Sequence, residues 1–331
     1  MITSIIERDD SIWQGHPDVA YFNHYLFVVY RESERHLVGS DTCIKLIKGH
    51  LDENKKFVKL TTKVIEKSQH RLNCPRLSVI NNKLYIICDK IISPDENYFT
   101  SENIEKNSRV FIWESSDGDR WGYPIATNVT GIVPDRICHF KDQLLIATHT
   151  QKENRLVQNV WNAQSITDKW NKNILADVGG LNLCEGSIIN DDDKLICLLR
   201  ENSGMGHPAF VTTSLNGIDW TPVCETKMFG CHRPVLGKLS SGKYLVTCRE
   251  QISQLNPMYW ARNTFAYLCV NYYFNNFILL PLDHDNSKIK SDSGYTGWAQ
   301  LDDNSIFVVN YITGDAPKPY IKGYLIDESD F

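Results

Sequence analysis

Twelve side chains at the ends of six recurring hydrophobic hairpins are the residues of this chain best suited to chemistry. They are Asp18, Arg76, Arg136, Glu185, Arg233 and Tyr295 where first strands begin, and Arg31, Asp89, His149, Arg200, Arg249 and Tyr311 where second strands end. A guanidinium group binds a carboxylate through two parallel hydrogen bonds, which an ammonium group does not. The set therefore indicates an anion-binding or sugar-binding centre, and the alternative is a rim of solvated strand ends.

The hairpins that position these side chains recur about every 50–60 residues. They span residues 16–31, 74–89, 134–149, 184–200, 231–249 and 294–311. One hairpin alone cannot bury its apolar face, so a strand repeat of this length predicts an all-β fold, a six-bladed β-propeller with blades of four antiparallel strands. The start of the first strand and the end of the second lie at the same edge of a hairpin. The twelve side chains are therefore expected on one face.

The bulk properties predict a single domain over residues 1–331. The chain has 42% hydrophobic residues, and its formal net charge of −5 gives no basic excess for nucleic acid. The N-terminus lacks the pattern of a signal peptide, and no apolar run is long enough to span a membrane. We also expect the segment from Thr3 to Arg8 to form a strand that joins the last blade and closes the ring.

Six of the ten cysteines fill equivalent places in the repeats: Cys74, Cys184 and Cys231 where hairpins begin, and Cys88, Cys197 and Cys248 near the ends of second strands. The chain has no CxxC pair, and both observations favour reduced structural thiols. This predicts a cytoplasmic protein, unless it is released by a nonstandard route. The sequence carries no complete dinucleotide fingerprint and no metal-ligand spacing, so neither cofactor nor metal is expected. The oligomeric state is left open.

A second repeat, S-x-[DN]-G-x-x-W, lies between the hairpins. It occurs at 115–121 and 214–220, with a degenerate copy at 165–170. Asp or Asn capping its own backbone, followed by Gly and an anchoring Trp, indicates a turn, which we place between the outer strands of a blade.

These loops resemble the Asp boxes of the sialidase (neuraminidase) superfamily, and the chain is similar along its length to a group of bacterial sialidase-like proteins. The resemblance rests on phrases such as YRESERH at 30–36, CEGSIINDDDKLICLLRE at 184–201 and SDSGYTGWAQLDDNSIFVVNY at 291–311. It implies the six-bladed fold. Because propellers of this kind include hydrolases, lyases and binding modules, function has to come from the site.

The resemblance also implies roles for individual residues. A keto-sugar acid carries a carboxylate on the carbon that is attacked, which repels a carboxylate nucleophile and favours a tyrosine activated by a glutamate. Tyr295 and Glu185 stand where sialidases place this pair. Arg200 and Arg249 match two members of the sialidase arginine triad, whereas the first member is replaced by the sequence His16-Pro17-Asp18. Arg76, Arg136 or Arg233 could substitute for it, and Arg31 is a further candidate for substrate binding.

The acid/base residue of sialidases follows the first hairpin, and that segment offers Glu34, His36 and Asp41 here. His36 is favoured because an imidazole donates protons near neutral pH, and Asp18 is the second candidate. The predicted activity is an exo-acting glycoside hydrolase that releases an acidic sugar such as sialic acid or a related nonulosonic acid. Alternatives are a noncatalytic carbohydrate-binding propeller and a lyase or glycosyl-transferring enzyme acting on an acidic polysaccharide.

Overall fold

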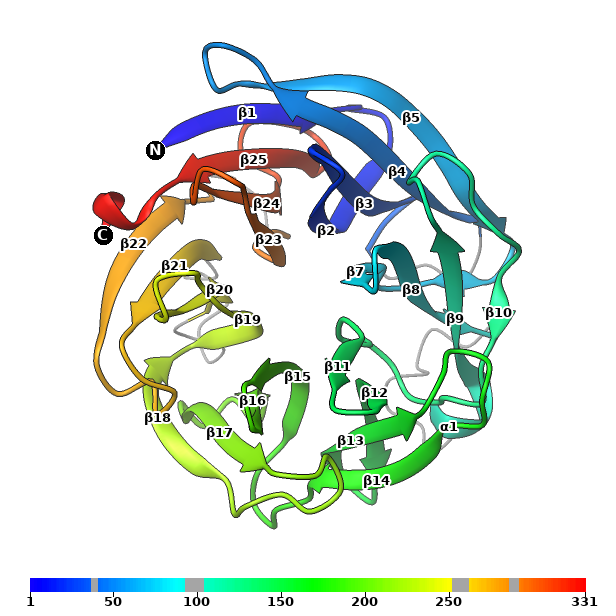
Figure 1. The fold of residues 1–331 in the computed structure, drawn as a ribbon, viewed down its shortest axis with the longest axis vertical. Coiled ribbons are helices and arrows are strands. Elements are labelled where there is room, and N and C mark those ends of the chain that lie inside the picture. Colours follow the sequence, from blue (N-terminus) through cyan, green and yellow to red (C-terminus); the bar gives the residue numbers. More distant parts are fainter. Residues whose placement is uncertain (37–40, 93–103, 252–261, 286–291) are drawn as a thin grey trace.

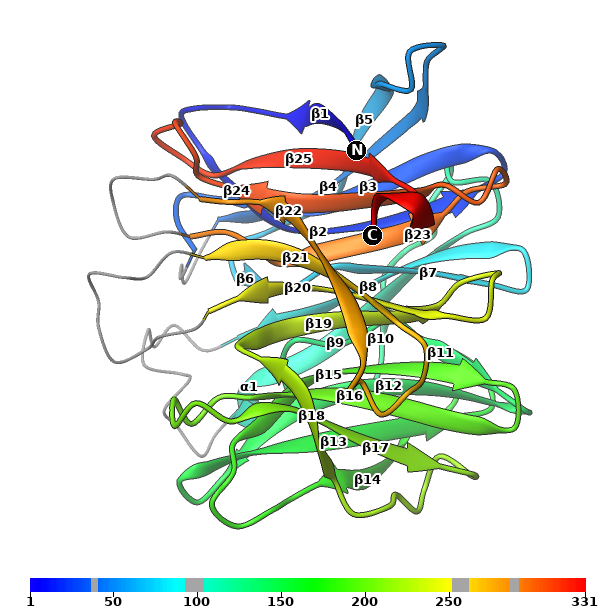
Figure 2. The ribbon, with the colours of Figure 1, turned by 90° about the vertical axis from the view of Figure 1, so that its left-hand side faces the viewer.

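The structure is a computed structural model that describes residues 1–36, 41–92, 104–251, 262–285 and 292–331. Six antiparallel sheets surround a common axis, as predicted (Figure 1). In Figure 2 the inner strands run along this axis, and outer strands such as β22 cross them obliquely because of the sheet twist. The result is the all-β, six-bladed propeller expected from the repeat.

The blades are numbered here in chain order. Blade 1 is β2 (Trp13–Phe22), β3 (Tyr25–Ser33), β4 (Thr42–Leu51) and β5 (Phe57–Ser68); blade 2 is β6 (Arg71–Leu72) and β7 (Arg76–Ile80), both paired with β8 (Lys83–Ile91), then β9 (Ser108–Ser115) and β10 (Ile125–Ala126); blade 3 is β11 (Cys138–Phe140), β12 (Gln143–Lys152), β13 (Arg155–Ala163) and β14 (Asn171–Ala176). Blade 4 is β15 (Leu183–Asp191), β16 (Lys194–Glu201), β17 (Pro208–Ser214) and β18 (Cys224–Phe229); blade 5 is β19 (Cys231–Lys238), β20 (Tyr244–Glu250), β21 (Asn263–Cys269) and β22 (Phe277–Asp283); blade 6 is β23 (Thr296–Gln300), β24 (Ile306–Ile312), β25 (Tyr320–Ile326) and β1 (Ile2–Glu7). Short helices α1 (Ile104–Asn107) and η3 (Glu328–Asp330) complete the described elements.

The core is divided among the interfaces between neighbouring blades. Side chains alternate between the two faces of a strand, so a strand between two blades is apolar on both faces. In β16, Leu195, Cys197 and Leu199 pack toward blade 3, whereas Ile196 and Leu198 pack toward blade 5. This two-sided burial explains why the strands of the repeated hairpins are continuous apolar runs in the sequence. Each fully buried aliphatic side chain stabilises the fold by about 1.5–3 kcal/mol relative to an exposed one.

The ring is closed by the N-terminal strand, as the sequence predicts. Strand β1 pairs antiparallel with β25, with Ile2 opposite Leu325 and Ser4 opposite Gly323. Lys56 on the β4–β5 hairpin adds a 2.7 Å hydrogen bond from its Nζ to the carbonyl oxygen of Thr3. Both termini therefore lie at blade 6 (Figure 1), and β1 holds blade 6 against blade 1.

Deleting residues 1–9 is expected to lower the melting temperature by on the order of 10 °C, because blade 6 loses its outer strand and exposes the edge of β25. A finer comparison uses two neighbours in β1. Ile6 is 3% exposed and Ile5 is 58% exposed, so Ile6→Ala should cost about 2–4 kcal/mol of unfolding free energy and Ile5→Ala about 0.5 kcal/mol or less. Equal melting temperatures for the full chain and the truncated chain would contradict this account of closure.

The S-x-[DN]-G-x-x-W segments form turns between the third and fourth strands of their blades, as predicted. In the first, the Ser115 Oγ accepts a hydrogen bond from the Gly118 backbone N–H at 2.8 Å, and Gly118 has a φ of 77°. Ser214 and Gly217 repeat this pair in blade 4, with a distance of 2.9 Å and a φ of 76°. A positive φ at the same place explains the glycine in both copies.

All ten cysteines lie in the described residues and are free thiols, eight of them buried. No helix in the described part of the chain is long and apolar enough to cross a membrane.

Candidate active site

A β-bulge at the start of the innermost strand shapes the site. The pairing register shifts between Gly15 and Asp18 in blade 1, and the shift recurs at the equivalent places in blades 4 and 5. The residues at the bulge are His16, Glu185 and Arg233, with φ values of 53°, 49° and 51°. Non-glycine residues rarely adopt a positive φ, and such strain is concentrated at functional sites. The bulge therefore gives these three residues equivalent places around the axis.

Tyr295 occupies the corresponding place in blade 6. Its preceding residue, Gly294, has a φ of 97°, and a Cβ built there would lie 2.6 Å from the Cγ of Arg249. Only glycine allows this close approach. The Arg249 guanidinium in turn lies over the Tyr295 ring, 4.3 Å from its centroid. Gly294 thus lets blade 5 place an arginine directly on the tyrosine.

The Tyr295 hydroxyl lies among one carboxylate and two guanidinium groups. It donates to the Glu185 Oε1 at 3.2 Å and accepts from Arg249 Nη2 at 3.2 Å and from Arg200 Nη1 at 3.4 Å. Arg200 Nη1 also binds Glu185 Oε2 at 2.7 Å. Arg233 faces the ring of Tyr295, 5.3 Å from the centroid. Blades 4, 5 and 6 therefore bring together the five residues that the sequence selects there.

The electrostatics of this cluster keep the glutamate ionised. Burial on its own raises the pKa of Glu185, but Arg200 and Arg233 outweigh burial and lower the pKa to about 2. Burial raises the pKa of the Tyr295 phenol, and Arg249 opposes that rise. Burial also lowers the pKa of the neighbouring His149 to about 4. At neutral pH the cluster therefore contains a carboxylate beside a protonated phenol and an uncharged imidazole.

Several buried nitrogen atoms around Tyr295 make no hydrogen bond within the described residues. They are the Nε atoms of Arg200 and Arg249, Nη1 of Arg233, Nδ1 of His149 and Nε2 of His16. Buried polar groups are almost always paired, so a cluster of unpaired ones needs an explanation such as a bound polar ligand. Arginine nitrogens are donors without exception. The cluster is therefore suited to a ligand that carries an anion.

A second group of polar side chains surrounds Asp292, close to the first. The Asp292 carboxylate binds His36 Nδ1 at 2.8 Å, Trp13 Nε1 at 2.7 Å and the Tyr311 hydroxyl at 2.9 Å. The His16 ring connects the two groups, with its centroid 4.8 Å from that of His36 and 5.3 Å from that of Tyr295. Sequence reasoning selected His36 but missed Asp292 and gave His16 no role.

Arg31 forms its hydrogen bonds with other protein groups and not with Tyr295. Its Nη2 donates to the backbone carbonyl of His36 at 2.5 Å, its Nη1 reaches Asn73 Oδ1 at 3.3 Å, and its guanidinium lies 4.4 Å from the centre of the Trp13 ring. In this structure Arg31 therefore supports the segment that carries His36.

Asp18, Arg76 and Arg136 form a separate ion cluster. Asp18 is fully buried, and its carboxylate binds Arg136 Nη2 at 2.5 Å and Nε at 3.0 Å. Arg76 Nη1 lies 3.6 Å from Asp18, and its Nη2 lies 3.4 Å from Asp135. The reason is the bulge, which makes His16 rather than Asp18 equivalent to Glu185. These three residues pair with protein groups and are not part of the cluster around Tyr295.

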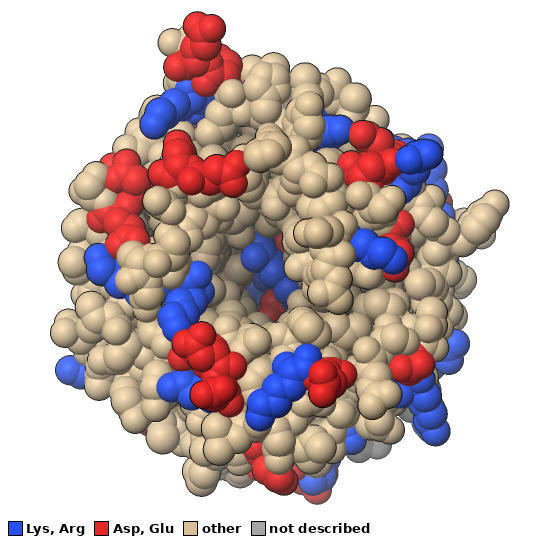
Figure 3. Space-filling model, in the orientation of Figure 1, with Lys and Arg blue, Asp and Glu red and all other residues tan. Residues whose placement is uncertain are grey.

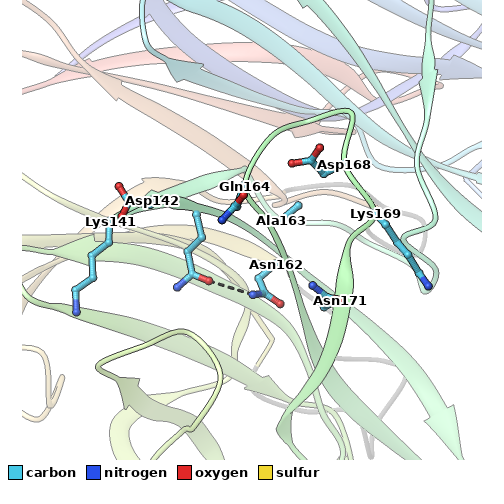
Figure 4. A pocket seen from close by; sticks show the side chains of 9 residues that line it. Lys141, Asp142, Asn162, Ala163, Gln164, Asp168, Lys169 and Asn171 are labelled. Atoms are coloured by element: carbon cyan, nitrogen blue, oxygen red, sulfur yellow. Dashed lines mark hydrogen bonds between the residues drawn. The ribbon is translucent and has the colours of Figure 1, made fainter.

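The molecule is hollowed at the axis, where both basic and acidic side chains are visible (Figure 3). A different groove, of about 570 Å³, is lined by the β11–β12 turn and by the segment that joins β13 to β14 in blade 3 (Figure 4). Two of its amides pair with each other, Asn162 Nδ2 with Gln143 Oε1 at 3.1 Å, and Gln143 Nε2 binds the Asn216 carbonyl. None of its lining residues belongs to either site cluster. Within the described residues, no group of three or more His, Cys, Asp or Glu side chains could hold a metal ion.

No protein-family model and no curated protein matches the sequence. The structure is similar to a protein of unknown function from Dyadobacter fermentans, with a TM-score of 0.75 and 16% identity over 98% of this chain and 97% of that chain. It is also similar to an intramolecular trans-sialidase from Ruminococcus gnavus, solved with oseltamivir carboxylate (TM-score 0.67, 8% identity, 96% and 95% covered).

A third similar structure is the Trypanosoma rangeli sialidase in a covalent intermediate with 2,3-difluorosialic acid (TM-score 0.65, 14% identity). The match covers 99% of this chain but 57% of the trypanosomal protein. At these identities the comparisons establish the architecture. The chain therefore has the sialidase-like six-bladed propeller fold.

Proposed function

We propose that this protein is a glycoside hydrolase of the sialidase type, which releases a terminal acidic sugar such as sialic acid or a related nonulosonic acid. The observation that carries the proposal is the Tyr295 hydroxyl, held between the Glu185 carboxylate and the guanidinium groups of Arg200 and Arg249. The similarity of the fold to sialidases supports it.

In the proposed reaction Tyr295 attacks the anomeric carbon of the sugar. The phenol proton passes to Glu185 as the bond between the tyrosine oxygen and the sugar forms. A neutral phenol approaches a carbon that carries a carboxylate with less repulsion than an aspartate or glutamate would. Arg200 and Arg249 donate to the same oxygen and stabilise the negative charge that develops on it. The position of the two arginines therefore favours attack over simple binding.

The sugar carboxylate is assigned to the guanidinium groups of Arg200, Arg249 and Arg233, which lie around Tyr295. Arg233 lies at the bulge of blade 5 and adds a positive charge to the site. Its guanidinium group faces the Tyr295 ring and is not one of the hydrogen-bond donors to the Tyr295 hydroxyl. His16 stands in blade 1 where the resemblance leads one to expect an arginine. Since burial lowers the pKa of His16 well below its ordinary value, His16 presents an uncharged ring, and the anion is held from blades 4 and 5.

His36 is assigned as the general acid that protonates the leaving oxygen, so activity should fall as pH rises through the pKa of His36. Burial lowers that pKa below the ordinary 6.5, which places the alkaline limb of the kcat/KM profile below pH 6.5. His36→Gln should abolish the limb. The control is His24→Gln, since the His24 side chain is 85% exposed. Rates that stay constant from pH 5 to 8 would contradict this assignment.

The proposed function is tested with a panel of nonulosonic-acid and uronic-acid glycosides, read by mass spectrometry. A released free sugar supports a hydrolase. An unsaturated product that absorbs ultraviolet light identifies a lyase, and unchanged glycan with measurable affinity identifies a binding module. Either of the last two results overturns the proposal.

A further inference from the structure

We propose that Asp292 is a positioning residue that orients His36 and sets its protonation. This inference rests on the proposed function, because it assigns the regulation of the proton donor at the same site. The Asp292 Oδ1 lies 2.8 Å from His36 Nδ1. The two residues come from opposite ends of the chain, His36 from the segment after β3 and Asp292 from the segment before β23, and they meet where blades 1 and 6 adjoin.

The Asp292 carboxylate is itself fixed by groups from both blades. Oδ2 accepts a hydrogen bond from Trp13 Nε1 at 2.7 Å, and Oδ1 accepts a second from the Tyr311 hydroxyl at 2.9 Å. Arg262 Nη1 lies 3.5 Å from Oδ1. Burial raises the pKa of Asp292, but the neighbouring His36, Trp13 and Arg262 outweigh burial and hold the pKa below its usual range. Asp292 is therefore an ionised acceptor that is held by groups from both blades.

An ionised acceptor at Nδ1 fixes the tautomer of His36. Nδ1 keeps its proton in both states of the ring, and Nε2 gains and loses the other proton. When His36 acts as an acid, the Nε2 proton moves to the glycosidic oxygen as the bond between that oxygen and the anomeric carbon breaks. When water later attacks the tyrosyl sugar, neutral Nε2 takes a proton from the water, and Glu185 returns the phenol proton to Tyr295. The cycle regenerates both residues.

The charges around His36 make its protonation depend on Asp292. Burial lowers the pKa of His36, and the positive charges of Arg31 and Arg71 lower it further, whereas Asp292 raises it. Among the described residues, the rings of His16, Trp13 and Tyr311 also lie beside this pair, and burial keeps the His16 ring uncharged at neutral pH by lowering its pKa. Removing the charge of Asp292 leaves a partly buried imidazole near the cations of Arg31 and Arg71. The imidazolium form then becomes much less stable.

The first arm of the test is nuclear magnetic resonance of the free protein with 15N-labelled histidine, which needs no substrate. The signal of His36 is assigned by its loss in His36→Gln. Asp292→Asn should lower the pKa of His36, because the carboxylate that raises it is lost, and should remove the preference for a proton on Nδ1. Tyr311→Phe removes one competing donor from Oδ1 and should raise the pKa of His36. A His36 pKa that is unchanged in both variants overturns the inference.

The chain offers a matched control in a second aspartate–histidine pair. His24 Nδ1 lies 2.9 Å from Asp302 Oδ2, but the two side chains are 85% and 66% exposed. Water screens such a pair. Asp302→Asn should therefore leave the resonances of His36 and the rate of hydrolysis unchanged. This control separates the effect of the less exposed His36–Asp292 pair, whose side chains are 29% and 23% exposed, from a general effect of losing one carboxylate.

The second arm compares two N-acetylneuraminic acid glycosides. The natural alkyl leaving group of sialyllactose needs protonation, whereas 4-nitrophenolate leaves without it. Asp292→Asn should lower kcat about 100-fold for sialyllactose and less than about 10-fold for the 4-nitrophenyl glycoside, and should move the alkaline limb to lower pH. Equal losses for both substrates overturn the role of Asp292 in proton donation, since damage to the whole site affects both alike.

The two arms keep the inference and the proposed function separate. If the unaltered protein hydrolyses neither glycoside, the proposed function fails for this sugar, and the histidine resonances still decide whether Asp292 controls His36. If Asp292→Asn does not fold, as judged by circular dichroism, Tyr311→Phe retains every charge and decides the question by the direction of the His36 pKa shift: a rise supports the inference, and no shift overturns it.

Discussion

Replacing Tyr295 with phenylalanine is expected to lower kcat by about 1,000-fold or more while leaving the affinity for an acidic sugar nearly unchanged. The variant lacks the oxygen that we propose forms the covalent bond, but it keeps the ring on which Arg249 packs. Hydrolysis of an aryl sialoside measures kcat, and calorimetry with the free sugar measures affinity.

Two comparisons make this prediction specific. Tyr244→Phe is the matched control, because the Tyr244 hydroxyl is also buried and donates to a carboxylate, Asp191, at 2.8 Å, yet it lies outside the site; it should retain full activity. Arg249→Ala removes a donor rather than the nucleophile, so it should weaken sugar binding about 10- to 100-fold. A fully active Tyr295→Phe protein would mean that the tyrosine is structural and that another mechanism, such as attack by a carboxylate-activated water, is used.

Replacing Asp18 with alanine is expected to lower the free energy of unfolding by about 3–5 kcal/mol, because breaking a buried ion cluster leaves charges without partners. Asp18 is fully buried and binds Arg136 through both of its oxygens. It also accepts a 2.9 Å hydrogen bond from the Leu77 backbone N–H in blade 2. The loss therefore weakens contacts among three blades, and chemical denaturation measures it.

Asp302→Asn is the control for this effect too, since Asp302 pairs at the surface and its loss should change stability little. An Asp18→Ala protein as stable as the parent but inactive would contradict the structural role assigned here. It would also favour Asp18 over His36 as the acid/base residue.

The fold could be predicted from the sequence because the pattern that determines it lies within each hairpin. Each hairpin has an apolar run on both strands, and six such runs cannot be buried except by packing on one another. The turns at Gly118 and Gly217 were predicted for similar reasons and are confirmed. The closing strand was predicted at Thr3–Arg8 and is observed at Ile2–Glu7. The roles of the site residues remain predictions.

The depth of each side chain along the axis could not be predicted. Counting from the end of the hairpin assumes regular pairing, but the bulge inserts residues at His16, Glu185 and Arg233. None of these is a glycine, so the sequence gives no sign of the positive φ. The sequence prediction therefore grouped Asp18 and Arg76 with Glu185 in one polar centre, whereas the structure pairs Asp18 and Arg76 with each other.

Asp292 was missed for a different reason. Its partner His36 lies 256 residues away in the chain, and the two meet only because closure of the ring brings blade 6 against blade 1. A sequence pattern reports neighbours within one hairpin, and it carries no signal for a pair formed across the closure.

The central claim is that Tyr295 forms a covalent bond to the sugar, and trapping with 2,3-difluorosialic acid tests it most directly. Fluorine destabilises the oxocarbenium-like transition states, so the intermediate accumulates. The protein is incubated with the reagent. Its intact mass is then measured by mass spectrometry, and the modified residue is located by peptide mapping. The account predicts one added sugar on the peptide that contains Tyr295 and none in Tyr295→Phe. A sugar attached elsewhere, or release of sugar from sialosides with no adduct on Tyr295, would contradict it.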